Sequence, residues 1–234
     1  MRRGYLAYDE TRDDYRPGVL VVPDWDGIGP YEEWRAKLLA QLGYVAFVAD
    51  TYGSDIPQGP SMPLSQREQL FSYLVSNRAD YRARMSAGLT QLRQARYVNG
   101  SQLGAIGYCL GGAGVIELAR GWPNGTDGLL GVAAFHGVPY TSNGTKATAG
   151  NPIRIVEFLG ANDVGFTPTD LEAFAAEMNA ANVTWEVDLF GQAAHAFTAP
   201  NLAVSGGTIN GLTVGVWNGE ANMAQWSKQG ALKD

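Results

Sequence analysis

The sequence predicts an α/β fold in which a mostly parallel central sheet is covered by helices on both faces. Short apolar runs of strand length alternate along the chain with longer amphipathic stretches of helix length. The chain has 234 residues, a length at which α/β folds commonly form one domain, and no linker-like segment divides it. Apolar residues make up 45% of the chain and charged residues 17%, which supplies a core and excludes disorder as the main state. We therefore expect a single domain over residues 1–234.

The predicted strands are short apolar runs that end at turn residues. They cover residues 18–22, 44–49, 103–108, 129–135, 154–159 and 184–190. The predicted helices repeat apolar positions every three or four residues. They cover residues 32–42, two segments between residues 65 and 96 that are separated near Ser76-Asn77, residues 112–119, residues 169–181, and a part of residues 220–229. The segments 51–64 and 191–215 are expected to be loop-rich excursions.

The first of these helices has a clear apolar face in the sequence. Its apolar positions are Trp34, Leu38, Leu39 and Leu42, which share one side of a helix. We expect this side to pack on the sheet.

Charge and hydropathy narrow the classes of partner. The formal charge is −6 with a pI near 4.9, and the only adjacent basic pair stands at Arg2-Arg3, so nucleic acid is not an expected partner. The apolar runs are much shorter than the roughly 20 residues of a membrane-spanning helix, so no membrane span is expected. For self-association, the expectation is a monomer or a weak homo-oligomer.

The compartment is left open by two opposing signals. A single cysteine, Cys109, cannot form an internal disulfide, and no secretory apolar segment precedes the first strand, which favours the cytoplasm. Glycosylation sequons are typical of secreted chains. Four are present, at Asn99, Asn124, Asn143 and Asn182. Three of them contain Asn-Gly, which is also ordinary turn chemistry, so secretion stays an alternative.

The glycine-rich segment 104–114 carries the strongest chemical signal, because it lies between a predicted strand and a predicted helix. Gly107, Cys109 and Gly111 form the pattern Gly-x-Cys-x-Gly of a nucleophile elbow. Both glycines are needed because side chains there would collide with neighbouring backbone. The N–H groups at the start of the helix favour a thiolate and offer donors to an oxyanion. The alternative is a buried structural cysteine.

A nucleophile of this kind needs a base, and the chain has only two histidines. In α/β-hydrolases the order along the chain is nucleophile, acid, base. Asp163 and His195 fit this order, and each follows a predicted strand, where sites in parallel sheets form. His136 precedes any plausible acid, so a satisfied residue at a strand end is the better interpretation of it, with pocket lining as the alternative.

Asp163 has three competitors as the residue that orients His195. Asp50 precedes the nucleophile, Asp170 begins a predicted helix, and Asp188 lies within a strand. Asp163 is therefore the best candidate, with helix capping as its alternative role.

The motifs resemble the dienelactone hydrolase family of α/β-hydrolases. The resemblance rests on Gly-Tyr-Cys-Leu-Gly-Gly at 107–112, the Gly-x-x-Asp turn at Asp163 and the segment His-Ala-Phe at 195–197. The likeness extends from about Gly4 to Trp226, which is nearly the whole chain, and further matches lie in segments 19–27 and 43–53 and in the Arg67 region. The resemblance implies hydrolysis of the lactone of dienelactone, a carboxymethylenebutenolide, to maleylacetate, without a metal or cofactor. It also implies a thioester formed on Cys109.

The family pattern further implies roles for four residues outside the Cys-His-Asp set. The N–H groups of Leu110 and Trp25 would form the oxyanion hole. Asp24 occupies the place of a carboxylate that gates the cysteine, which is usually Glu in the family. Arg67 matches one of two arginines that hold the substrate carboxylate. The second is missing, because residues 196–199 after the histidine contain no arginine. A weaker preference for anionic substrates is therefore expected.

Three other functions remain open at this stage. An esterase or thioesterase of the same fold could act on a different, neutral ester. A non-catalytic binding protein with this scaffold is the alternative of another class, and a redox-sensing thiol is a further one. Metal catalysis is not expected, because two histidines and one cysteine far apart in the sequence offer no zinc-like spacing.

Overall fold

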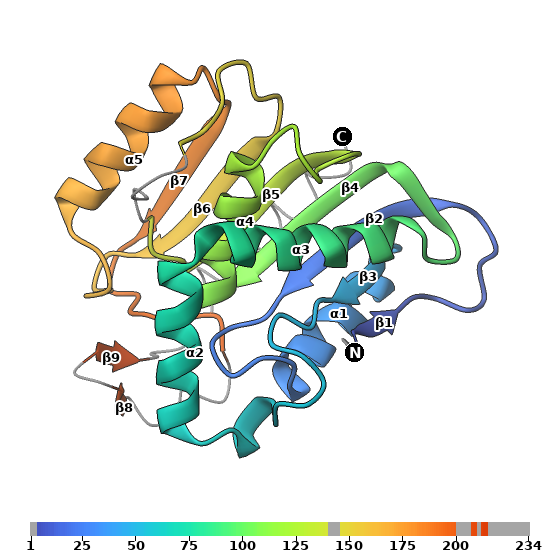
Figure 1. Cartoon of the computed structure of the whole chain (residues 1–234), viewed down its shortest axis with the longest axis horizontal. Coiled ribbons are helices and arrows are strands. Elements are labelled where there is room, and N and C mark those ends of the chain that lie inside the picture. The colour runs from blue at the N-terminus through green and yellow to red at the C-terminus, as the bar shows by residue number, and fades with distance from the viewer. Residues whose placement is uncertain (1–3, 140–145, 200–206, 210–211, 215–234) are drawn as a thin grey trace.

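The computed structural model describes residues 4–139, 146–199, 207–209 and 212–214 (Figure 1). Its centre is a seven-stranded sheet in the order β1-β3-β2-β4-β5-β6-β7, in which β1 runs antiparallel to β3 and every other pair is parallel. The strands are β1 (Tyr5–Ala7), β2 (Arg16–Val22), β3 (Val45–Val48), β4 (Val98–Tyr108), β5 (Leu129–Phe135), β6 (Arg154–Gly160) and β7 (Trp185–Phe190). The predicted α/β class with a mostly parallel sheet is confirmed.

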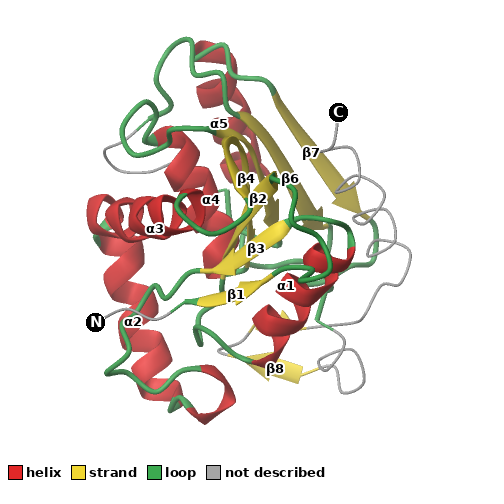
Figure 2. Cartoon of the chain, turned by 90° about the vertical axis from the view of Figure 1, so that its right-hand side faces the viewer, coloured by secondary structure: helices red, strands yellow, loops and turns green. Residues whose placement is uncertain are grey.

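The described helices cover both faces of the sheet, as expected. They are α1 (Pro30–Gln41), the short 3-10 helix η1 (Gly59–Ser61), α2 (Leu64–Ser76), α3 (Arg78–Arg93), α4 (Leu110–Arg120) and α5 (Pro168–Ala180). Figure 2 shows α1 on one side of the sheet and α3 and α4 on the other. The break that was predicted between two helices near Ser76-Asn77 is where α2 ends and α3 begins.

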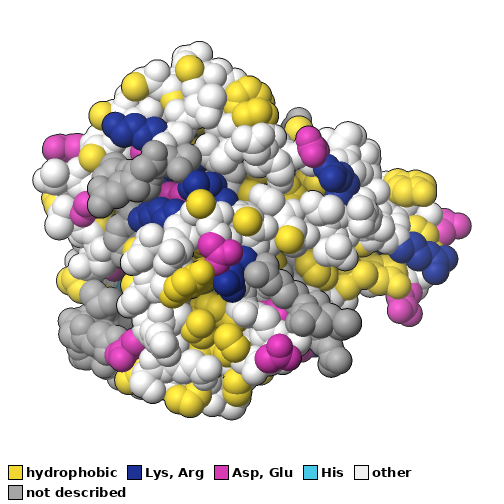
Figure 3. Space-filling view, in the orientation of Figure 1, with side chains coloured by type: hydrophobic (Ala, Val, Ile, Leu, Met, Phe, Trp, Pro, Cys, Tyr) yellow, Lys and Arg dark blue, Asp and Glu magenta, His cyan; other side chains and the backbone are white. Residues whose placement is uncertain are grey.

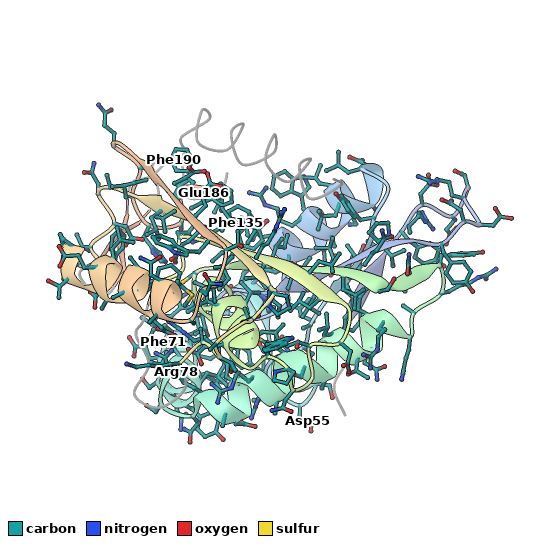
Figure 4. All side chains as sticks on the ribbon, turned by 90° about the horizontal axis from the view of Figure 1, so that it is seen from above. Asp55, Phe71, Arg78, Phe135, Glu186 and Phe190 are labelled. Carbon is teal, nitrogen blue, oxygen red and sulfur yellow. The ribbon has the colours of Figure 1, made fainter. Side chains whose placement is uncertain are left out.

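Two apolar clusters fill the space between the sheet and the helices. The larger contains Leu20, Leu89 and Phe174 and lies on the side of α3, α4 and α5. The smaller contains Leu39 and Phe135 and lies on the side of α1. Figure 4 shows the same division: Phe135 and Phe190 lie on one side of the sheet, and Phe71 and Arg78 lie on the other. The sheet is thus buried on both faces, as a parallel sheet requires.

The buried face of α1 differs from the predicted one. Trp34 and Leu42 are 36% and 37% exposed, whereas Glu32 and Arg35 are buried, together with Ala36, Leu39 and Ala40. The predicted face is wrong because Glu32 and Arg35, which the apolar pattern does not include, occupy buried positions and make polar contacts there.

Helix α4, which follows the proposed nucleophile, is tied to its neighbours by buried ion pairs. The carboxylate of Glu117 contacts Arg78 at 2.7 Å, Arg82 at 2.8 Å and Arg120 at 2.8 Å. Arg120 also makes a two-pronged contact with Glu177 of α5, at 2.9 and 2.8 Å. Paired charges of this kind are costly to break, so the position of α4 between α3 and α5 is well fixed.

The remaining differences from the predicted elements lie at edges. β1 was not predicted, and β4 begins at Val98, five residues before the expected start. Two short strands, β8 (Gly207–Ile209) and β9 (Leu212–Val214), pair antiparallel within the expected excursion. The helix expected within residues 220–229 and the sequon at Asn143 lie outside the described residues.

Among the described helices, none has the length and apolar content needed to cross a membrane. On the face drawn in Figure 3, Lys and Arg side chains lie in small groups among acidic and apolar ones.

Candidate active site

The carboxyl ends of the parallel strands bring the predicted site residues to one edge of the sheet. Val22 pairs with Gly107, Tyr108 pairs with Phe135, and Phe135 pairs with Phe158, so these strands end at nearly the same level. Cys109 directly follows β4, and the loops that hold Asp163 and His195 follow β6 and β7. Residues distant in the chain therefore become neighbours.

Cys109 lies in a strained turn between β4 and α4. Its φ and ψ are 51° and −114°, a conformation that residues other than glycine rarely adopt. A Cβ on Gly107 would lie 2.0 Å from the carbonyl oxygen of Gly111, and a Cβ on Gly111 would lie 2.2 Å from that of Val22. The collisions expected from the sequence are therefore real, and the two glycines allow the strand, the turn and the helix to approach this closely.

His195 lies between Cys109 and Asp163. Its Nε2 is 3.0 Å from Sγ of Cys109, and its Nδ1 is 2.8 Å from Oδ2 of Asp163. The other oxygen of Asp163 accepts a hydrogen bond of 2.8 Å from the N–H of Gly165. The three side chains are thus arranged in the order that a nucleophile, its base and the acid that orients the base require.

The loop with His195 is held against the end of β6. The N–H of Ala161 donates to the carbonyl of Phe190, and the N–H of Asn162 donates to that of Ala193. A Cβ on Gly160 would lie 2.4 Å from the carbonyl oxygen of Ala193, so the close approach requires glycine. Asp163 and His195 are therefore fixed relative to each other by backbone contacts as well as by their own hydrogen bond.

The surroundings favour a charged His195. Burial alone would lower the pKa of His195, but Cys109 and the hydrogen bonds to Asp163 and Cys109 raise it to about 10. An imidazolium facing the sulfur is the partner that a thiolate needs. Near neutral pH, His195 is thus expected to carry a proton on both ring nitrogens.

The other aspartates that competed with Asp163 have different contacts. Asp50 accepts hydrogen bonds from the N–H groups of Tyr52 and Gly53. Asp170 forms a capping box with Thr167 at the start of α5. Asp188 lies within β7, as expected.

The two backbone N–H groups that were expected to form an oxyanion hole belong to Leu110 and Trp25. Leu110 begins α4, and its N–H makes no hydrogen bond among the described residues, as is usual for the first residue of a helix. The loop with Trp25 begins at Pro23, whose carbonyl oxygen would lie 2.4 Å from a Cβ on Gly111. The hydroxyl of Tyr52 donates to the carbonyl of Trp25 at 2.9 Å and so helps to fix this loop.

Asp24 belongs to a cluster of three carboxyl groups with Asp26 and Glu32. Their nearest oxygens lie within 4.8 Å of one another. In the described part of the chain, these three carboxyl groups form the cluster that is compact enough to hold a metal ion. Burial, Glu32, Asp26 and Cys109 raise the pKa of Asp24 well above its usual range. Burial likewise raises the pKa of Glu32 to about 8. These shifts indicate that Asp24 and Glu32 keep a proton to higher pH than ordinary carboxyl groups do.

Arg67 contacts the turn before α2 and Asp26 of the loop that follows β2. Its Nε donates to the carbonyl of Met62 at 3.0 Å, and its Nη2 donates to those of Pro60 and Gly59 at 3.2 and 3.4 Å. Its Nη1 is 3.7 Å from Asp26. The guanidinium that was expected to bind a substrate carboxylate thus holds the turn before α2.

His136 is buried and satisfied, as its better interpretation predicted. Its Nδ1 accepts a hydrogen bond of 3.1 Å from the N–H of Cys109, and its Nε2 lies 2.7 Å from Oγ1 of Thr198. Thr198 was not predicted as a site residue, because a lone threonine in a loop matches no motif. Glu32 also escaped notice, since an acidic residue in the first turn of a helix is ordinary.

With this geometry in hand, comparison with known proteins identifies the family. The model of the dienelactone hydrolase family matches residues 3–230. The chain belongs to the dienelactone hydrolase family. It is accordingly placed among hydrolases that act on ester or lactone bonds.

Individual relatives are similar at lower levels. A Bradyrhizobium protein named "Probable 2-oxo-3-(5-oxofuran-2-ylidene)propanoate lactonase" is 24% identical over 189 residues, which cover 77% of this chain and 73% of the relative. The carboxymethylenebutenolidase of Pseudomonas putida is 27% identical over 120 residues, which cover half of each chain. A crystal structure of a dienelactone hydrolase-like promiscuous phosphotriesterase from metagenomic libraries has 30% identity and a TM-score of 0.84, covering 99% of this chain and 91% of that one. The α/β-hydrolase fold is thereby confirmed.

Proposed function

We propose that this member of the dienelactone hydrolase family cleaves small carboxylic esters or lactones through a thioester formed on Cys109. The observation that carries the proposal is the continuous contact from Sγ of Cys109 through His195 to Asp163, at 3.0 and 2.8 Å. The cysteine lies at a strained strand-to-helix turn, where backbone strain is commonly associated with function.

In the acylation step, the thiolate of Cys109 attacks the carbonyl carbon while His195 holds the proton on Nε2. The carbonyl oxygen becomes an oxyanion beside the N–H groups of Leu110 and Trp25. The bond to the leaving oxygen then breaks, and that oxygen takes the proton from Nε2. With a lactone, the new hydroxyl remains on the acyl group, because the ring has opened.

In the deacylation step, Nε2 of His195 removes a proton from water as the water attacks the thioester carbonyl. The bond from carbon to Sγ breaks, the carboxylic acid leaves, and the thiolate and the protonated His195 are restored. Asp163 keeps the proton on Nδ1 throughout, so that Nε2 faces the reacting atoms. These residues need no metal or cofactor for either step.

For the substrate, we favour a neutral ester or lactone over the carboxylate-bearing dienelactone. Arg67 uses Nε and Nη2 on backbone carbonyls, and Asp26 lies beside its Nη1. Asp24, which interacts with Cys109, adds an acidic group rather than a cation near the nucleophile. Hydrolysis of dienelactone to maleylacetate stays the second candidate, because carboxymethylenebutenolidases are among the relatives.

The test uses p-nitrophenyl acetate as a neutral probe and the single cysteine as a label site. One iodoacetamide adduct on Cys109 should abolish hydrolysis, and Cys109→Ala should do the same. Cys109→Ser should keep a small activity, because the base and the oxyanion donors remain. Full activity in the singly alkylated protein would overturn the proposal. Comparison of dienelactone with an uncharged lactone of similar size then decides between the two substrate classes.

A further inference from the structure

The second histidine connects the nucleophile to the loop that holds the first. His136 directly follows β5, is 2% exposed and has a φ of 42°. Its Nδ1 lies 3.1 Å from the backbone nitrogen of Cys109, whose N–H it shares with the carbonyl of Phe135 at 3.0 Å, and its Nε2 lies 2.7 Å from Oγ1 of Thr198. Thr198 comes three residues after His195. One imidazole thus spans the two segments that must meet for catalysis.

The contacts determine which nitrogen of His136 carries the proton. A backbone N–H can only donate, so Nδ1 must offer its lone pair to Cys109 and the proton must be on Nε2. Nε2 therefore donates to the hydroxyl of Thr198. Burial, His195 and Arg35 hold the pKa of His136 well below its usual range, so this neutral form persists beside the charged His195.

The other side of Thr198 is fixed by α1. Its carbonyl accepts a hydrogen bond of 2.7 Å from Nη2 of Arg35, and its hydroxyl lies 2.7 Å from that of Tyr31. Nε of Arg35 donates to the hydroxyl of Tyr31 at 3.2 Å. The Arg35 guanidinium also lies over the rings of Tyr31, Trp34 and Tyr108, 4.8 to 5.2 Å from their centroids. Thr198 is completely buried among these groups.

We propose that His136 and Thr198 are positioning residues that set the distance between Sγ of Cys109 and Nε2 of His195. This inference rests on the proposed function. The two act through backbone: His136 holds the N–H of the nucleophile, and Thr198 holds the chain just beyond the base. Neither is assigned a proton transfer. Supporting contacts of this kind typically change activity 10-fold to 100-fold, because small displacements of reacting groups slow the chemical step.

The first experiment compares Thr198→Val with Thr198→Ser, which differ in the hydroxyl. For p-nitrophenyl acetate, we expect Thr198→Val to lower kcat about 10-fold to 100-fold with KM changed less than about twofold. Thr198→Ser should recover most of the loss. Thr126→Val is the matched control, because Thr126 is also buried and its hydroxyl donates to Pro123 far from the site. It should leave kcat unchanged.

The second experiment measures alkylation of Cys109 by iodoacetamide against pH, which needs no substrate. A displaced His195 stabilises the thiolate less, so Thr198→Val should slow alkylation near neutral pH and shift the profile upward. His136→Asn removes the contact with Thr198 by changing the histidine instead of the threonine. Asparagine tolerates the positive φ at this position, and its side-chain oxygen can take the place of Nδ1 as the acceptor. It should shift the profile in the same direction, and the double variant should lose little more than either single one.

These measurements separate failure of the inference from failure of the proposed function. If hydrolysis persists in Cys109→Ala, the proposed function is wrong, and the alkylation profiles still decide whether His136 and Thr198 position the pair. If folded Thr198→Val and Thr198→Ser match the unmodified protein in kcat and in alkylation, the inference is overturned. A lower melting temperature with unchanged profiles would show a purely structural role and would also overturn it.

Discussion

Replacement of Asp163 by Asn should lower kcat for ester hydrolysis by about 10³ to 10⁴ while the fold is kept. The direction follows from the two contacts of the carboxylate. Oδ1 accepts from the N–H of Gly165 and Oδ2 faces Nδ1 of His195, each at 2.8 Å. In Asn, the amide oxygen must stay on Gly165, because an NH₂ group there would face another donor. The NH₂ group then faces His195 and forces the proton of the ring onto Nε2, which is the wrong nitrogen for a base.

The size of the effect has two parts. The pKa of His195 is raised from 6.5 to about 10, which corresponds to roughly 5 kcal/mol of stabilisation of the imidazolium. Cys109 and Asp163 share this stabilisation, so loss of Asp163 removes part of it and lowers the pKa of His195. The unfavourable tautomer adds to this effect, and the same substitution in a serine-protease triad lowers kcat by about 10⁴.

The assay is steady-state hydrolysis of p-nitrophenyl acetate, with circular dichroism to confirm folding. Iodoacetamide should also react more slowly with Cys109 in Asp163→Asn at neutral pH, because a weaker imidazolium stabilises less thiolate. Asp170→Asn is the matched control, since it makes the same chemical change in a capping box at the start of α5. A loss below tenfold in folded Asp163→Asn would refute the role of Asp163 as the orienting residue.

Further predictions concern the carboxyl cluster and Arg67. Because the pKa of Asp24 is raised, this carboxyl group becomes charged only as pH rises. Asp24→Asn should therefore accelerate alkylation of Cys109 by iodoacetamide more at pH 9 than at pH 6. If the ratio of the variant's alkylation rate to that of the unmodified protein did not change with pH, gating by Asp24 would be contradicted. Glu32 has a folded-state pKa of about 8 against 4.5 when unfolded, so it stabilises the fold fully below pH 4.5 and loses this contribution as pH rises toward 8. Glu32→Gln should therefore flatten the pH dependence of the free energy of unfolding by up to about 1.4 kcal/mol per pH unit in urea titrations, whereas Glu33→Gln should not. Arg67→Ala should destabilise the fold by about 1 to 3 kcal/mol and lower activity on anionic and neutral esters alike; a selective rise of KM for the anionic ester would restore a substrate role.

The parts of the fold that the sequence predicts are those in which local pattern and burial agree. The parallel strands are apolar on both faces, so β2, β5 and β6 stand out as continuous runs. β1 has three residues and lies at the edge of the sheet, where such a run is not required. The start of β4 contains Asn99-Gly100, which is typical of a turn.

The candidate site also has residues that local sequence features predict and residues that they do not. Cys109, Asp163 and His195 follow from a motif, a chain order and the positions of strand ends, which are all local features. The contacts of His136 with Thr198 depend on how three distant segments meet, and no spacing in the sequence encodes them. The role of Arg67 in substrate binding came from a resemblance and from its place at a helix start, and it stays a prediction, because neither feature indicates that its Nε donates to the carbonyl of Met62.

Helix α1 is where stability and the proposed chemistry compete most directly. Glu32 and Arg35 lie one turn apart on its buried face, where apolar side chains of similar size would usually stabilise a fold more. They make different contacts: Glu32 joins the carboxyl cluster with Asp24, and Arg35 donates to the carbonyl of Thr198, three residues after His195. Burial of a polar or ionisable side chain costs free energy that its hydrogen bonds must offset, so a helix that places two such side chains in the core contributes less to stability than its length allows. The same two side chains connect α1 to the loop with Asp24 and to the chain that follows His195, which an apolar face could not do through polar contacts.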